Sequence, residues 1–89
     1  SDSIRLNLVE ALIPIDSKLA NQQFKLLKKP NEDSKSDTYY RYTARWWLCK
    51  SYIDPLEKLT CLRESISVYK KAGCTRAAKI LESRLHSFV

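Results

Sequence analysis

The spacing of apolar side chains along the chain predicts a protein built of helices. From Leu8 to Leu27 they recur every three or four residues, the period that places them on one face of an α-helix. Pro14 falls inside this segment, and a proline removes a backbone donor and clashes with the preceding turn. Because the apolar face continues beyond Pro14, the pattern predicts one helix over residues 3–28 that kinks at the proline.

The segment 38–53 carries the strongest apolar signal and predicts the central helix. It holds six of the nine aromatic residues of the chain. A helix that is apolar nearly all round is buried between neighbours or covered by a partner. Its apolar side chains form two rows at helical spacing: the first is Tyr39, Tyr42, Trp46, Cys49 and Ile53, and the second is Tyr40, Ala44, Trp47, Leu48 and Tyr52. The second row is therefore either core or an exposed docking surface.

Residues 54–57 indicate where the second expected helix ends and the third begins. Asp54 suits a helix cap, Pro55 the first helical position, and Glu57 the third position of a capping box. A third helix is therefore expected over 55–72, directly after the second.

Two further turns complete the chain. Residues 29–37 contain no large apolar side chain, which predicts a flexible solvent loop. Gly73 follows the third helix where a left-handed residue is favoured, and Thr75 is a suitable cap for a fourth helix over 75–88.

Together these patterns predict an all-α fold, a four-helix antiparallel bundle that forms a single interaction domain over 1–89. The expected core comprises Leu8, Leu12, Leu19, Phe24, Tyr42, Trp46, Cys49, Ile53, Leu59, Leu62, Ile66, Ala78, Leu81 and Leu85.

Residues 45–85 resemble the helical hairpins of tetratricopeptide-type (TPR-like) repeats. Leu48 and Tyr52 recur as Leu81 and Leu85, close to a period of about 34 residues. The segment YKKAGCTRAAKIL resembles the junction between two such repeats. The resemblance implies paired antiparallel helices whose concave groove binds a partner. In size and helix-only pattern the chain is also similar to the microtubule-interacting-and-trafficking (MIT) domain, a small antiparallel bundle that binds helical peptides.

Charge is distributed unevenly along the chain. Residues 1–38 carry six basic and six acidic side chains, whereas residues 39–89 carry ten basic and four acidic ones. The whole net charge of +6 therefore lies in the second part. This asymmetry favours an acidic partner, either a protein segment or a nucleic acid.

No catalytic or metal-binding pattern accompanies these features. His86 is the single histidine, and Cys49, Cys61 and Cys74 do not have the spacing of a zinc site. A single glycine cannot build a glycine-rich phosphate loop. We therefore expect no enzyme, no metal and no cofactor.

The sequence also indicates where such a protein acts. No apolar run approaches the roughly 20 residues that span a bilayer, so no membrane span is expected. No secretory signal is visible, and the odd number of cysteines suits a reducing compartment. The chain lacks an initiator Met, so we expect part of a larger intracellular protein, cytoplasmic or nuclear.

These observations predict a non-enzymatic protein–protein interaction module, an adaptor or scaffold domain that binds an acidic and apolar peptide, helical or extended. Off-seam aromatic residues would anchor the peptide, and basic residues would steer it. One alternative is a nucleic-acid-binding helical domain that uses the basic C-terminal part, and another is an oligomerisation domain, homo- or hetero-oligomeric. The candidate binding residues are Tyr40, Arg41, Arg45, Trp47, Tyr52, Lys70, Lys71, Arg76 and Lys79.

Overall fold

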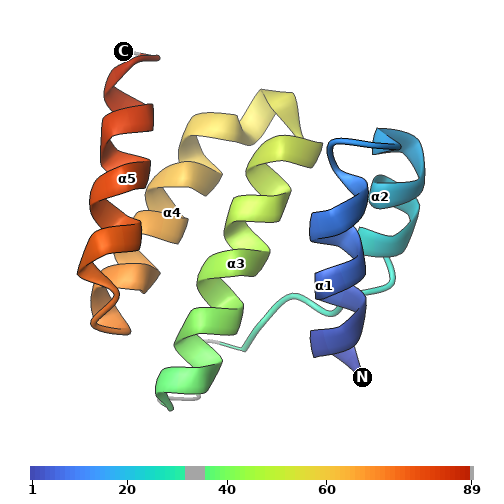
Figure 1. Ribbon diagram of the computed structural model, residues 1–89, viewed down its shortest axis with the longest axis horizontal. Helices are drawn as coiled ribbons and strands as arrows, with labels where there is room; N and C mark the ends of the chain where they lie inside the picture. The colour runs from blue at the N-terminus through green and yellow to red at the C-terminus, as the bar shows by residue number, and fades with distance from the viewer. Residues whose placement is uncertain (32–35, 89) are drawn as a thin grey trace.

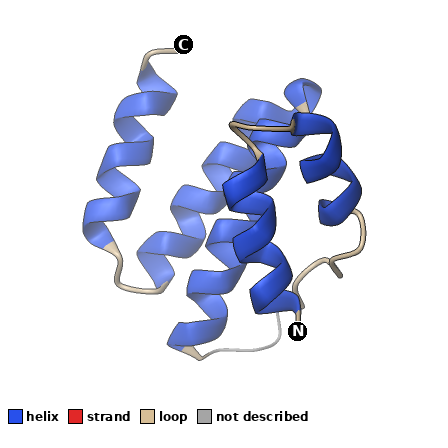
Figure 2. Ribbon diagram, turned by 45° about the vertical axis from the view of Figure 1, so that its right-hand side comes forward, coloured by secondary structure: helices blue, strands red, loops and turns tan. Residues whose placement is uncertain are grey.

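The computed structural model describes residues 1–31 and 36–88, and all regular structure in these ranges is helical (Figures 1 and 2). The all-α class is therefore confirmed. The molecule is a flattened slab of 31 × 30 × 19 Å. Along the chain the elements are α1 (Asp2–Leu12), α2 (Ser17–Phe24), α3 (Asp37–Ile53), the 3-10 turn η1 (Pro55–Glu57), α4 (Lys58–Lys71) and α5 (Thr75–His86).

The N-terminal segment forms a helical hairpin, so the single kinked helix expected over 3–28 is wrong. α1 ends at Leu12, the chain reverses around Pro14, and α2 runs back beside α1 (Figures 1 and 2). Asp16 leaves the helical region and its Oδ1 accepts a hydrogen bond from the Leu19 backbone N–H at 3.0 Å. The apolar period that continues past Pro14 therefore belongs to two helices that share one neighbour.

α3 is the central element, because it contacts α1 and α2 on one side and α4 on the other (Figure 1). The side chains that α3 packs toward the N-terminal hairpin are Tyr42, Trp46, Cys49 and Ile53 of its first row and Trp47 of its second. The rings of Trp46 and Phe24 lie 5.1 Å apart between centroids, an arrangement worth about 1 kcal/mol beyond the area that it buries. The buried cluster on this side is Leu6, Val9, Phe24, Leu27, Trp46 and Cys49.

The contact between α3 and α4 is made by small side chains. Ala44, Cys61 and Ser65 are wholly inaccessible to solvent. The Ser65 hydroxyl donates a hydrogen bond of 2.7 Å to the backbone carbonyl of Ala44. Small residues at a crossing let two helix backbones approach closely, so the two helices form one unit.

α4 lies behind and between α3 and α5 in Figure 1, and it joins them through a second cluster. Gly73, with φ at +74°, makes the turn into α5 as the sequence predicts. The second cluster consists of the buried Leu62, Ile66, Ala78 and Leu81, with Leu48, Tyr69 and Leu85 packed against it.

Two expected core residues are on the surface. Leu8 is 46% exposed and Leu19 is 38% exposed. α1 buries Leu6 and Val9 instead, so its inward face is rotated from the one expected. Leu19 follows the reversal at Pro14, and α2 turns Ala20 and Phe24 inward in its place.

The caps near residues 54 and 75 differ in detail from the prediction. The Asp54 side chain accepts a hydrogen bond from Leu56 N–H, but Glu57 pairs with Lys50 instead of completing a capping box. Cys74, without a side-chain cap, precedes α5, so Thr75 is its first residue. Part of the loop expected over 29–37, residues 32–35, lies outside the described residues.

Candidate functional site

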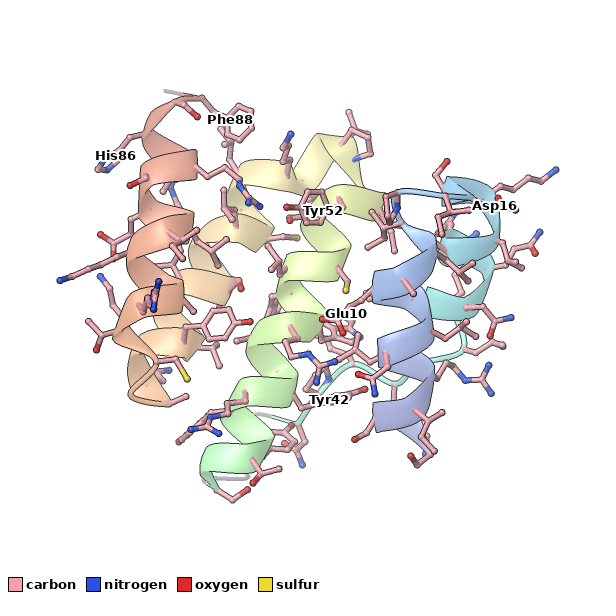
Figure 3. All side chains as sticks on the ribbon, in the orientation of Figure 1. Glu10, Asp16, Tyr42, Tyr52, His86 and Phe88 are labelled. Carbon is pink, nitrogen blue, oxygen red and sulfur yellow. The ribbon has the colours of Figure 1, made fainter. Side chains whose placement is uncertain are left out.

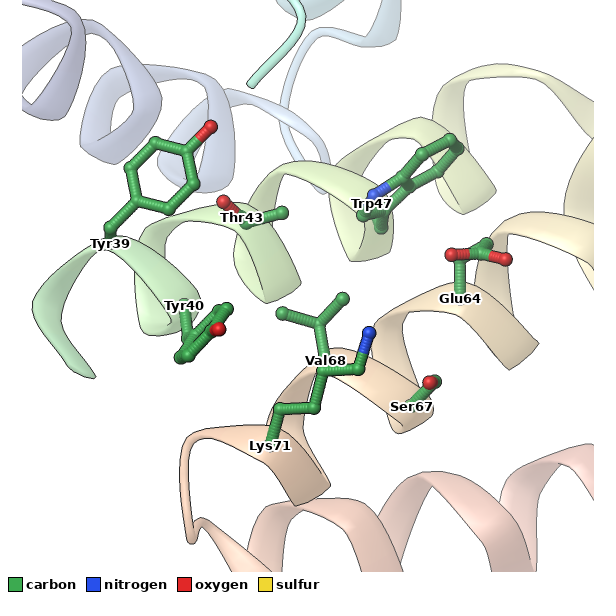
Figure 4. A pocket seen from close by; sticks show the side chains of 8 residues that line it. All are labelled: Tyr39, Tyr40, Thr43, Trp47, Glu64, Ser67, Val68 and Lys71. Carbon is green, nitrogen blue, oxygen red and sulfur yellow. The ribbon is translucent and has the colours of Figure 1, made fainter. Parts of the chain in front are cut away.

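Three of the candidate binding residues meet in one pocket between α3 and α4: Tyr40, Trp47 and Lys71. Two facing stripes form its walls, because each helix contributes side chains at intervals of three and four residues, the spacing of one helix face. The pocket has a volume of about 370 Å³ (Figure 4). It is lined from α3 by Tyr39, Tyr40, Thr43 and Trp47, and from α4 by Glu64, Ser67, Val68 and Lys71.

Lys71 and Glu64 bring opposite charges into this α3–α4 pocket. The Lys71 side chain extends beside Val68 toward the centre of the pocket, and Glu64 stands at the Trp47 end (Figure 4). Within the described parts of the chain, neither Lys71 nor Glu64 takes part in an ion pair. Both charges are therefore available to a bound molecule.

Trp47 stands in a basic environment at one end of the α3–α4 pocket. The ammonium of Lys29 lies 5.2 Å from the centre of its ring, and that of Lys50 lies 5.5 Å from it. Cations at this distance are attracted by the electrons of the ring face. Lys50 also pairs with Glu57 at 3.0 Å, which raises the pKa of Lys50. The indole and its two lysines therefore present apolar surface together with positive charge.

Thr43 is the most buried polar side chain among those that line the α3–α4 pocket. The residue is 5% exposed, and its hydroxyl has no hydrogen-bond partner among the described residues. Buried hydroxyls are nearly always hydrogen-bonded, and an unpaired one costs stability. The Thr43 oxygen is covered by protein atoms, as is the Tyr39 hydroxyl oxygen, which likewise has no hydrogen-bond partner among the described residues, so neither oxygen is open to a molecule in the pocket.

Tyr52, the third candidate anchor, lies in a separate groove between α3 and α5, and Figure 3 shows it near the C-terminal end of α3. The side chains of Tyr52 and Ile80 are 46% and 54% exposed. The Arg84 guanidinium donates a hydrogen bond to the Tyr52 hydroxyl and so bridges the groove. The groove has a volume of about 280 Å³ and is lined by Leu48, Tyr52, Tyr69, Ala77, Ile80, Leu81 and Arg84.

Two of the candidate basic residues are engaged within the protein. Arg45 forms an ion pair with Glu10, which lies between α1 and α3 in Figure 3, and the hydrogen bond to Glu10 raises the pKa of Arg45. Lys70 pairs with Glu82 at 2.8 Å and lowers the pKa of that carboxyl. The remaining three, Arg41, Arg76 and Lys79, are exposed and line neither the pocket nor the groove.

Sequence reasoning missed Glu64, Ser67 and Thr43 as site residues. Glu64 and Thr43 belong to no sequence motif that would single them out. The signal that could have found them is the matched spacing of side chains on two neighbouring helices. These are Tyr40, Thr43 and Trp47 on α3, and Glu64, Ser67 and Lys71 on α4. A polar stripe opposite an aromatic stripe indicates a lined cleft, but only once the facing register of the two helices is known.

The cysteines and the histidine do not assemble a reactive centre. Cys49 and Cys61 are buried, and burial raises the pKa of both thiols, that of Cys49 to about 12. A thiol is a poor nucleophile until it ionises. His86 is exposed at the end of α5. Across residues 1–31 and 36–88, no three His, Cys, Asp or Glu side chains are grouped to hold a metal ion.

Two further findings bear on the identity of the protein. In the described part of the chain, each helix is too short or too polar to cross a bilayer. A search against models of known protein families, curated proteins and solved structures finds no match.

Proposed function

We propose that this chain is a non-enzymatic protein–protein interaction module of a larger intracellular protein, and that it binds an acidic and apolar peptide segment, helical or extended. The observation that carries the proposal is the α3–α4 pocket. It combines aromatic surface from Tyr40 and Trp47 with the ammonium of Lys71, which has no ion-pair partner among the described residues. Ligand sites characteristically combine apolar walls with a few converging polar groups.

The arrangement of the helices supports the same proposal. α3, α4 and α5 follow one another through short turns, and α3 and α5 flank a groove above α4. Residues 45–85 resemble TPR-like hairpins, and that resemblance implies a concave surface that binds a peptide. The anchoring hypothesis required Tyr40, Trp47 and Tyr52 not to be buried, and all three are partly or largely accessible.

A nucleic-acid ligand is less well supported. Phosphate binding requires several free cations along one surface. Arg45 and Lys70 are engaged by acidic partners, and the Glu64 carboxylate lies in the same pocket as Lys71. The Glu64 carboxylate in the same pocket as the Lys71 ammonium favours a ligand with one carboxylate over a polyanion.

Fluorescence anisotropy of three labelled probes tests the proposal. The first is a blocked peptide that alternates Asp with Leu and Phe, the second replaces each Asp by Lys, and the third is a single-stranded oligothymidine. We expect the acidic peptide to bind at least tenfold more tightly than the basic one at 150 mM salt, and the oligonucleotide to bind weakly. Tighter binding of the oligonucleotide, with a steep loss on adding salt, would contradict the proposal.

A further inference from the structure

The groove between α3 and α5 leaves apolar side chains uncovered in the described part of the protein. α5 packs on α4, and its backbone approaches neither α1 nor α3 closely. Leu48 and Leu81 line this α3–α5 groove, and Tyr52 and Ile80 stand half exposed along it. A continuous exposed apolar surface marks a binding site, whereas single scattered side chains do not.

A second hollow, between α1 and α3, extends this apolar surface. Ile13 and Pro14 line it at the end of α1, and it shares Leu48 and Tyr52 with the α3–α5 groove. Its volume is about 410 Å³. Leu48 and Tyr52, four residues apart, therefore form a ridge on α3 that has a hollow on each side.

Arginine side chains border the α3–α5 groove. Arg84 lines it and forms no ion pair among the described residues. Arg41 lies seven residues before Leu48, and Arg76 lies four before Ile80, so each shares a helix face with the residue that it precedes. α3 and α5 run in the same direction (Figure 1), and Arg84 bonds to the C-terminal part of α3. Arg41 and Arg76 therefore lie toward one end of the groove and Arg84 toward the other.

Acidic side chains do not offset this positive charge. Among the described residues that line the α3–α5 groove and the adjoining hollow, the only carboxylate is that of Glu10, and Arg45 holds it in an ion pair. Burial raises the pKa of Tyr69 in the groove, and the charge of Arg45 opposes this rise, so Arg45 also acts on the groove. Electrostatic complementarity therefore favours a partner that carries carboxylates.

The lining of the α3–α5 groove favours a helical ligand over an extended one. An extended segment is held chiefly by hydrogen bonds to its main chain. The groove offers few groups for such bonds, because four of its seven lining side chains are aliphatic and Arg84 already donates to the Tyr52 hydroxyl. A helix satisfies its own main chain and needs only apolar contact. Both walls present side chains four residues apart, Leu48 with Tyr52 and Ile80 with Arg84, the rows against which a further helix packs.

The length of the surface sets the length of the ligand. Tyr52 follows Arg41 by eleven residues on α3, which corresponds to about 16 Å of helix axis, or about three turns. We infer that the α3–α5 groove binds an amphipathic helix of about three turns, whose apolar face lies against Leu48, Tyr52 and Ile80 and whose carboxylates pair with the arginines at the two ends of the groove. The inference rests on the proposed function and assigns the helical form of the ligand to a surface separate from the α3–α4 pocket.

Three blocked peptides of about 14 residues, titrated into the ¹⁵N-labelled protein, test the inference. The first is a helix-forming sequence of Ala and Gln with Leu at positions i, i+4 and i+7 and Glu in its first and last turns. The second replaces each Glu by Gln, and the third is the first with a central Pro. We expect the first to shift the amide signals of Leu48, Tyr52 and Ile80 and to bind about tenfold more tightly than the second. It should also bind at least tenfold more tightly than the third, because proline breaks a helix.

Two pairs of variants locate the contacts. Ile80→Gln should weaken binding of the Glu peptide about tenfold, whereas the control Ile4→Gln, at an exposed isoleucine of α1, should not change it. Arg84→Gln should weaken the Glu peptide about fivefold and leave the Gln peptide unchanged, a selectivity that loss of folded protein would not produce. The control Arg63→Gln, exposed on α4 and outside the groove, should affect neither peptide.

Three results would overturn the inference. Equal binding of the proline peptide would show that the ligand is extended. Shifts of the Trp47 and Ser67 signals in place of Ile80 would put the helix in the α3–α4 pocket. Movement of the groove signals with protein concentration alone would show that a second copy of this chain is the occupant.

The alternating Asp peptide distinguishes the inference from the function on which it rests. If that peptide binds and the helical Glu peptide does not, the assignment of the groove is wrong and the proposed function stands. If neither peptide binds, both the assignment and the proposed function fail.

Discussion

Burial, more than residue type, decides what single side chains of this protein can do. Cys49 packs against α1 beside Trp46, and loss of water around the sulfur is the main cause that raises the pKa of its thiol to about 12. Burial likewise raises the pKa of Tyr42, Tyr69 and Cys61. These groups hold their protons in the folded state, which makes them packing residues.

The raised pKa of Cys49 predicts loss of stability at alkaline pH. The unfolded chain releases this proton near pH 9 and the folded chain near 12, so between those values the folded state binds more protons. The free energy of unfolding therefore falls as pH rises, and from pH 8 to 10 this one thiol accounts for about 1 kcal/mol.

Urea denaturation at pH 8 and pH 10 measures this effect. Cys49→Ala lacks the titrating group, so its free energy of unfolding should fall by about 1 kcal/mol less between pH 8 and pH 10 than that of the natural chain. The variant is expected to be less stable than the natural chain at both pH values. Equal losses in both proteins would show that Cys49 does not hold its proton.

At the scale of helices, the α3–α4 contact fixes the geometry of the candidate site. Ser65 and Ala44 are wholly buried at the crossing, joined by the 2.7 Å hydrogen bond from Ser65 to the Ala44 carbonyl. The α3–α4 pocket begins where these small side chains give way to the larger Tyr40, Trp47 and Lys71. A change in the spacing of the two helices would therefore alter the pocket directly.

Substitution of Ser65 tests this contact. Ser65→Ala removes one hydrogen bond and should cost about 1 kcal/mol of stability. Ser65→Val loses the same bond and adds bulk between two touching helices, so it should cost about 2–3 kcal/mol. Urea denaturation gives both values, and Ser83→Val on the exposed face of α5 is the control for helix propensity. If Ser65→Val is no worse than Ser65→Ala, the helices are not closely packed there.

Local signals predicted most of the elements. Gly73 makes the turn into α5, as the sequence indicated, because a glycine at such a position acts through its own backbone conformation. The reversal at Pro14 was missed because a proline fits both a kink and a break, and helical periodicity does not distinguish them. The orientation of α1 depends on packing against α3, so Leu8 was assigned to the core in place of Leu6.

For the whole molecule, α3 joins the two buried clusters, since it shares one with α1 and α2 and packs Leu48 against the other, which α4 and α5 form. α1 and α2 pack on α3 from one side, α4 and α5 follow on the other, and the Arg45–Glu10 pair ties α1 to α3. Tyr40 and Trp47 were identifiable as candidate anchors from their place off the main seam. Their convergence with Glu64 and Ser67 depends on how two helices face each other, which a single sequence does not specify.

Selection from an unbiased random-peptide display library on the immobilised protein at 150 mM salt is the most direct test of the central claim that this is a peptide-binding module. We expect enriched peptides to carry an Asp or Glu flanked by apolar or aromatic residues, and the same peptides to lose enrichment on Lys71→Gln but not on Lys79→Gln. Enrichment of basic peptides, or no enrichment above an uncoated surface, would contradict the account.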